Sequence, residues 1–252
     1  MKHYREALTH TIAFFVLFCG ALTALLGFSV GVLFPDPILP TDAGVGLDAG
    51  EEYHGITVVI DAGHGGEDGG TQSADGMYEK TVNLEIAQML DTMLRADGIA
   101  TVMTRTDDIL LYDRNADYRG HKKMLDLAAR RQIAEETENA LFVSIHMNSF
   151  PETKYHGLQV FYSPNNPSSQ EMAEEIRQCT RLYLQPQNNR QTKAATSSIY
   201  LLDRLKCPAV LVECGFLSNP EEAALLRTEN YRRQMAFVLF CAVRSYISSQ
   251  NA

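Results

Sequence analysis

The sequence predicts an α/β domain with a mostly parallel central sheet and helices on both faces, preceded by one N-terminal transmembrane helix. From residue 56 onward, short apolar runs alternate with longer segments of helical periodicity, which is typical of strands joined by crossover helices. These runs are apolar throughout, as expected for parallel strands that are buried on both faces. A long uncharged stretch, residues 11–34, precedes them.

The predicted elements of the domain follow one another in strand–helix order. The expected strands are 57–60, 99–104, 141–145, 157–162 and 209–212. The expected helices are 80–96, 124–136, 169–184 and 231–247. The first helix has Val82, Ile86 and Leu90 at helical spacing, and Gly98 follows it as a stop signal.

The residues before the domain divide into three segments. A helix of about 24 residues spans about 36 Å, enough for a bilayer core of roughly 30 Å, so residues 11–34 are expected to be a membrane anchor. Lys2 and Arg5 precede this stretch, so the positive-inside rule keeps residues 1–10 in the cytoplasm and places the domain on the other side of the membrane. Residues 35–55 are rich in Pro, Gly and Asp and form a linker to the domain at 56–252. A cleaved signal peptide and a secreted protein remain the alternative.

Composition excludes some classes of function. The formal net charge is −9 and no stripe of Lys and Arg is present, which argues against nucleic acid as a partner. The five cysteines are scattered without CxxC spacing, so they are expected to be buried apolar residues rather than a disulfide framework.

Four residues far apart in the sequence stand where a ligand would bind. His64, His146 and Glu213 each follow a predicted strand, and Glu79 opens the first predicted helix. Because ligands bind beyond the carboxyl ends of parallel strands, all four are expected at one edge of the sheet. Two imidazoles and a carboxylate are a known ligand set for catalytic zinc, and a further carboxylate can serve as base. The pattern therefore predicts a zinc hydrolase.

Two of these residues, and two nearby features, also have other interpretations. His146 alone could be a satisfied core histidine, and Glu79 could be an acid that favours a helix start. The glycine-rich loop 63–70 could be a plain turn or a phosphate-binding loop. Phosphate binding is disfavoured, because the loop lacks the GK[ST] ending of a phosphate-binding loop and its two acids would repel phosphate. Cys214 could be a thiol nucleophile with a histidine base, although no spacing signature supports this.

The same residues lie in motifs that resemble a known family, the zinc-dependent N-acetylmuramoyl-L-alanine amidases of bacterial cell walls (the amidase_3 type). The matching segments are Ile60-Asp61-Ala62-Gly63-His64-Gly65-Gly66-Glu67-Asp68-Gly69, Glu79-Lys80 with Asn83-Leu84, Met103-Thr104-Arg105, Ser144-Ile145-His146-Met147-Asn148-Ser149 and Val212-Glu213-Cys214-Gly215-Phe216-Leu217-Ser218-Asn219. The resemblance covers roughly residues 56–247.

The resemblance implies a role for each of the four residues. His64, Glu79 and His146 would bind Zn²⁺, and Glu213 would be the catalytic carboxylate. The substrate would be peptidoglycan, glycan strands with stem peptides, cut at the amide between N-acetylmuramic acid and L-alanine. The anchor and the stretch Ser198-Ile199-Tyr200-Leu201-Leu202 are most similar to those of sporulation and germination amidases, which prepare spore cortex for muramic-δ-lactam formation. This similarity implies that the domain lies in the bacterial cell envelope or in the forespore intermembrane space.

The alternatives are a general wall amidase in division or autolysis, a metallopeptidase with similar site chemistry, and a non-catalytic wall-binding module of the same fold. The intact set of four residues argues against the last of these. The sequence does not decide whether a protein partner activates the enzyme.

Overall fold

The computed structural model describes residues 55–112 and 120–250. Three predicted segments lie outside the described residues: the cytoplasmic N-terminus at 1–10, the membrane segment at 11–34 and nearly all of the linker at 35–55. Within the described part, no helix combines the length and apolar character needed to cross a bilayer.

The described elements alternate between strands and helices over most of the domain. The strands are β1 (Thr57–Ala62), β2 (Ala100–Met103), β3 (Ala140–Asn148), β4 (Gln159–Tyr162), β5 (Lys193–Ala194) and β6 (Ala209–Phe216). The helices are α2 (Glu79–Ala96), α3 (Lys122–Glu136), α4 (Ser168–Tyr183), α5 (Tyr200–Arg204), α6 (Pro220–Arg227) and α7 (Glu229–Gln250). Every strand and helix expected from the sequence is therefore present, while β5, α5 and α6 are additions.

The strands form one six-stranded sheet in the order β2-β1-β3-β6-β4-β5. The neighbours from β2 to β6 pair in parallel, but β4 runs antiparallel to β6, and β5 is parallel to β4. The sheet is thus mixed: four of its five strand pairs are parallel, as expected, and the β4–β6 pair is antiparallel. The short loop between β3 and β4 explains this, because a parallel return needs a crossover of a dozen or more residues.

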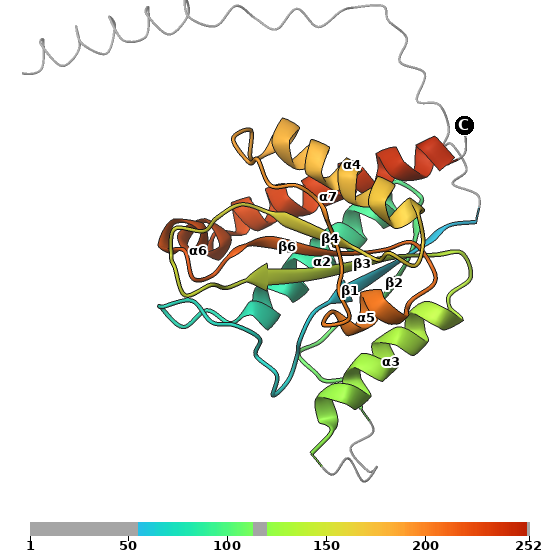
Figure 1. Cartoon of the computed structure of the whole chain (residues 1–252), viewed down its shortest axis with the longest axis horizontal. Coiled ribbons are helices and arrows are strands. Elements are labelled where there is room, and N and C mark those ends of the chain that lie inside the picture. The colour runs from blue at the N-terminus through green and yellow to red at the C-terminus, as the bar shows by residue number, and fades with distance from the viewer. Residues whose placement is uncertain (1–54, 113–119, 251–252) are drawn as a thin grey trace, which may run out of the picture. The chain divides into compact units, whose positions relative to one another are not determined.

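Helices cover both faces of the sheet, as predicted (Figure 1). The helices α2, α4 and α7 pack on one face, where the odd-numbered residues Leu141, Val143 and Ile145 of β3 join the larger apolar core. The helices α3 and α5 lie on the other face, over Phe142 and Leu211. Because side chains alternate along a strand, this parity decides which face each polar residue of β3 and β6 reaches.

The end of α2 shows how local sequence sets an element boundary. Gly98 has φ of 83°, a left-handed conformation that glycine adopts without strain. The Gly98 amide donates to the Arg95 carbonyl and the Ile99 amide to the Leu94 carbonyl, which is the Schellman pattern of a helix C-terminus. The predicted stop at Gly98 is confirmed.

Candidate metal centre

His64 lies in the loop that follows β1, two residues beyond the strand. Its backbone has φ of 61°, a conformation that is uncommon for any residue other than glycine. On one side, its ring Nε2 lies 3.3 Å from Oε1 of Glu79. On the other, Nδ1 lies 2.9 Å from Oδ2 of Asp68, an ion pair without hydrogen-bond geometry. The imidazole is therefore held between two carboxylates.

Glu79 is the first residue of α2, and its side chain points into the protein. It is 3% exposed, and its carboxylate accepts hydrogen bonds from the backbone amides of Thr71 at 2.8 Å and Met147 at 3.0 Å. An acid that only favours a helix start would remain in solvent. The two amides instead fix this carboxylate beside the histidines.

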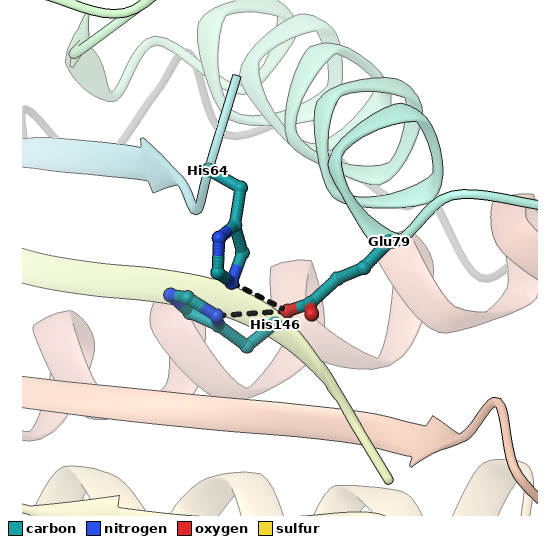
Figure 2. Close-up of side chains that lie close together, drawn as sticks. All are labelled: His64, Glu79 and His146. Carbon is teal, nitrogen blue, oxygen red and sulfur yellow. Dashed lines mark hydrogen bonds and ion pairs between the residues drawn. The ribbon is translucent and has the colours of Figure 1, made fainter. Parts of the chain in front are cut away.

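His146 brings the third side chain to the same point. It lies on the face of β3 that carries α3 and α5, and its Nδ1 is 2.9 Å from Oε1 of Glu79. Figure 2 shows both imidazoles directed at the one carboxylate. One ligand atom from each of His64, Glu79 and His146 lies within 4.8 Å of the other two. Three residues spread over more than 80 positions thus form a single cluster.

Glu213 lies beside this cluster but outside it. Its Cα partner across the β3–β6 pair is His146, so both side chains leave the sheet on the same face. Within the described structure, its Oε2 is buried and has no hydrogen-bond partner. His146 and Glu213 were expected just after their strands, and this is wrong: both lie inside them, because the backbone ladder continues past the apolar runs to Asn148 and Phe216.

Two glycines of the loop make the close packing of the cluster sterically feasible. A Cβ on Gly63 would lie 2.2 Å from Nε2 of His146, and one on Gly70 would lie 2.4 Å from Oε2 of Glu79. No side chain fits at either position without displacing a cluster residue. The glycine-rich loop therefore wraps the cluster with bare backbone.

The electrostatics separate Glu213 from the other carboxylates. Burial raises the pKa of Glu213 to about 7, and the nearby histidines offset this only in part. Burial acts on Glu79 in the same direction, but its contacts with His146 and His64 outweigh that and hold its pKa well below the usual value. For His64, burial opposes the charge, yet Asp68 and Glu79 raise the pKa of the imidazole to about 9.

A cavity of about 270 Å³ opens on this face of the sheet, bounded by His64, His146 and Glu213. Its apolar wall comes from Leu127 of α3, Ile199 before α5 and Leu211 of β6, and Lys123 lies among its other lining residues. The stretch Ser198–Leu201, notable in the sequence, thus forms part of the cavity wall.

Several residues at the site were assigned no role from the sequence, although Asp68 and Arg105 lie within the matching motifs. Asp68 contacts His64, and two buried arginines, Arg105 and Arg130, hydrogen-bond to the loop that carries His64. The one-turn spacing of Asp126 and Arg130 is a signal that could have indicated their ion pair. Cys214 is fully buried on the opposite face, with its pKa raised by burial, so this thiol has no access to the cavity.

Comparison with known proteins decides the family. The Amidase_3 model, described as N-acetylmuramoyl-L-alanine amidase, matches residues 58–244. The chain belongs to this amidase family. The germination-specific N-acetylmuramoyl-L-alanine amidase of Bacillus subtilis is 32% identical over 197 residues, 78% of this chain and 82% of that protein. The family activity, cleavage of peptidoglycan as an N-acetylmuramoyl-L-alanine amidase, is therefore the activity of this enzyme.

Solved structures agree with this assignment. The CwlD amidase from Clostridioides difficile, solved in complex with the GerS lipoprotein, is 36% identical with a TM-score of 0.72, and the match covers 77% of this chain and 98% of that one. The amidase AmiC2 of Nostoc punctiforme is 31% identical with a TM-score of 0.65, covering 77% and 97%. The predicted resemblance to N-acetylmuramoyl-L-alanine amidases is confirmed.

Proposed function

We propose that this amidase is a zinc enzyme in which His64, Glu79 and His146 bind Zn²⁺ and Glu213 transfers the proton. The bond that breaks would be the amide between the lactyl group of N-acetylmuramic acid and L-alanine. The observation that carries the proposal is the convergence of three ligand atoms within 4.8 Å of one another, with the unpartnered Glu213 Oε2 beside them.

The donor set fits zinc. Tetrahedral zinc with ligands at about 2.0 to 2.2 Å holds its ligand atoms about 3.3 to 3.6 Å apart, and the Glu79 carboxylate is already 2.9 and 3.3 Å from the two ring nitrogens. Two imidazoles and a carboxylate leave a fourth position for water, as catalytic sites require. Asp68 at the far nitrogen of His64 is the outer carboxylate that often orients a ligating histidine.

When bound, Zn²⁺ supplies Lewis acidity, which polarises a carbonyl oxygen and lowers the pKa of a coordinated water to about 7. Glu213 is suited to the accompanying proton transfer, because its pKa of about 7 lets it gain and lose a proton near neutrality. Its Oε2 would accept the proton of the attacking water and deliver it to the amide nitrogen of L-alanine as the bond breaks. The apolar wall at Leu127, Ile199 and Leu211 would receive the lactyl and alanyl methyl groups.

The metal assignment is tested on the full-length protein purified in detergent. We expect about one zinc per chain, loss of activity on chelation, and its return with Zn²⁺. Mass spectrometry of digested peptidoglycan should find free stem peptides with an N-terminal L-alanine. Activity that survives complete removal of metal would overturn the zinc proposal.

We also propose that the enzyme acts on spore cortex. The similarity to the germination-specific enzyme of Bacillus subtilis and to CwlD supports this role. Deleting the gene in its source organism should give spores without muramic-δ-lactam. Normal cortex together with unseparated vegetative cells would favour the general role in division or autolysis.

The location is a further proposal, with residues 11–34 as the membrane anchor and the catalytic domain in the envelope. A reporter enzyme fused after Asp42 should be active outside the cytoplasm. Activity of the fusion inside, or a mature N-terminus near residue 35, would contradict the anchor.

By analogy with the CwlD–GerS complex, a lipoprotein partner is also proposed. Full activity of the zinc-loaded enzyme alone would contradict a requirement for such a partner.

A further inference from the structure

The three residues of the cluster are supported in different ways. Glu79 stands in the first turn of α2 and His146 inside β3, so regular hydrogen bonding fixes their backbones. His64 lies in a loop between elements, and its φ of 61° is a conformation that persists only where the surroundings enforce it. Something other than secondary structure must therefore hold His64 in place.

Arg130 of α3 spans the turn that carries His64. Its Nη1 donates to the carbonyl of Ala62 at 2.7 Å, and its Nη2 donates to the carbonyl of His64 at 2.8 Å. The side chain is 2% exposed. The planar fork of a guanidinium is suited to fixing two acceptors at once, so a single residue restrains both ends of the turn.

Arg105 holds the same turn from the other side. Its Nε donates to the Ala62 carbonyl at 2.8 Å and its Nη2 to the Gly63 carbonyl at 3.0 Å. It also donates to the carbonyls of Lys80 and Asp107. The carbonyls of residues 62, 63 and 64 therefore each accept a hydrogen bond from an arginine.

Buried carboxylates hold Arg130 in this pose. Its Nη1 pairs with Oδ1 of Asp61 at 2.7 Å, and its Nε pairs with Oδ2 of Asp126 at 2.7 Å. Asp61 in turn accepts from the hydroxyls of Ser144 at 2.6 Å and Thr104 at 2.8 Å. Replacing such buried ion pairs with apolar residues is often neutral or stabilising, so stability alone is a weak reason for this network.

We propose that Arg130 and Arg105 are positioning residues that preset the backbone of His64 for metal binding. The inference rests on the proposed role of His64 as a zinc ligand. Arg130 also lines the cavity, but in this proposal both arginines act through the three carbonyls of the turn, and we call this set of hydrogen bonds the clamp. Loss of the clamp should let the turn relax from its left-handed conformation and move the imidazole away from Glu79.

The test compares Arg130→Lys with Arg232→Lys in the full-length protein. A lysine keeps the positive charge between Asp61 and Asp126 but cannot span two carbonyls as a fork does. Arg232 is the control, because it too donates to two backbone carbonyls: its Nη1 bonds to Leu226 at 2.7 Å and to Arg227 at 2.6 Å, at the end of α6 and away from the His64 turn. Zinc affinity is measured by competition with a chromophoric chelator, and the melting temperature is measured with and without zinc.

We expect Arg130→Lys to weaken zinc binding by about 10- to 100-fold, the usual effect of losing an outer partner of a metal ligand. The rise in melting temperature on adding zinc should shrink, and the amides of residues 62–65 should exchange hydrogen faster in the zinc-free protein. Arg232→Lys should lower the melting temperature while leaving zinc affinity unchanged. Arg105→Lys should behave as Arg130→Lys does, and it provides a second variant if the first does not fold.

Three results would overturn the inference. Wild-type zinc affinity in both Arg130→Lys and Arg105→Lys would show that the clamp only stabilises the fold. An equal loss of affinity in Arg232→Lys would show a general effect of destabilisation. A wild-type protein that binds no zinc would instead refute the proposed function, and the inference with it.

Discussion

Replacement of Gly63 by alanine tests the steric basis of the site. The added Cβ would lie 2.2 Å from Nε2 and 2.3 Å from Cε1 of His146. Ordinary contact begins near 3.4 Å, so the ring must retreat by about 1 Å, because repulsion rises steeply below the contact distance. Gly63 does not have a positive φ, so the backbone itself accepts alanine and the conflict falls on His146.

The size of the effect follows from that displacement. Metal–ligand distances tolerate only about ±0.2 Å, and a misplacement of about 1 Å costs on the order of 100-fold in rate. We therefore expect Gly63→Ala to bind zinc at least about 10-fold more weakly and to cleave muropeptides about 100-fold more slowly. The circular dichroism spectrum should remain that of the wild type.

The matched control is Gly98→Ala. Gly98 has φ of 83° and nothing within 4 Å of an added Cβ, so alanine there introduces backbone strain of about 1 to 2 kcal/mol without a steric conflict. This variant should melt at a lower temperature yet keep zinc and activity. The assay is zinc content by atomic absorption, with release of stem peptides from purified muropeptides. If Gly63→Ala keeps wild-type affinity and rate, His146 does not occupy the place where the structure puts it.

Three further predictions concern the buried acids and the thiol. Glu213→Gln should keep near-stoichiometric zinc while losing about 10²- to 10⁴-fold in cleavage rate. His146→Ala should lose both zinc and activity, so zinc content and cleavage rate measured together distinguish the two variants. Cys214→Ala should keep activity, and in the native wild type this thiol should resist alkylation, as mass spectrometry would show, because it is fully buried with a raised pKa. Burial opposes ionisation of Asp61, but Arg130 and the Ser144 hydroxyl outweigh burial and lower the pKa of Asp61. The ionised Asp61 therefore stabilises the fold above about pH 4, and this contribution is lost as the pH falls below that. Asp61→Asn should cost about 3 to 5 kcal/mol at pH 7 in urea unfolding, and an unchanged midpoint would contradict the pairing.

The four candidate residues were identified from the sequence because each lies at a point where local pattern changes. The apolar runs 57–60, 141–145 and 209–212 end one to four residues before His64, His146 and Glu213, and the predicted helix 80–96 begins directly after Glu79. Periodicity reflects burial of one face or both, which is a property of neighbouring residues. The rule that ligands bind at the carboxyl edge of parallel strands then brought the four together.

The boundaries and directions of strands were harder to predict. Polar residues at the ends of β3 and β6 looked like loop, yet the ladder continues through them, because backbone pairing does not depend on side-chain polarity. The antiparallel direction of β4 depends on which strand it joins across the sheet. The short elements α5 and β5 are too brief to show a period.

Local sequence is enough to predict the strand–helix order, the four polar residues at the carboxyl edge and the small residues that leave room around them. These follow from local apolar patterning and from residue chemistry. Three features come from the folded arrangement instead: Glu213 stands apart from the three-residue cluster, Gly63 lies against His146, and Arg105 and Arg130 hold the turn at His64. Those contacts join residues tens of positions apart, and they exist only once the strand register and the helix packing have set which side chains share a face.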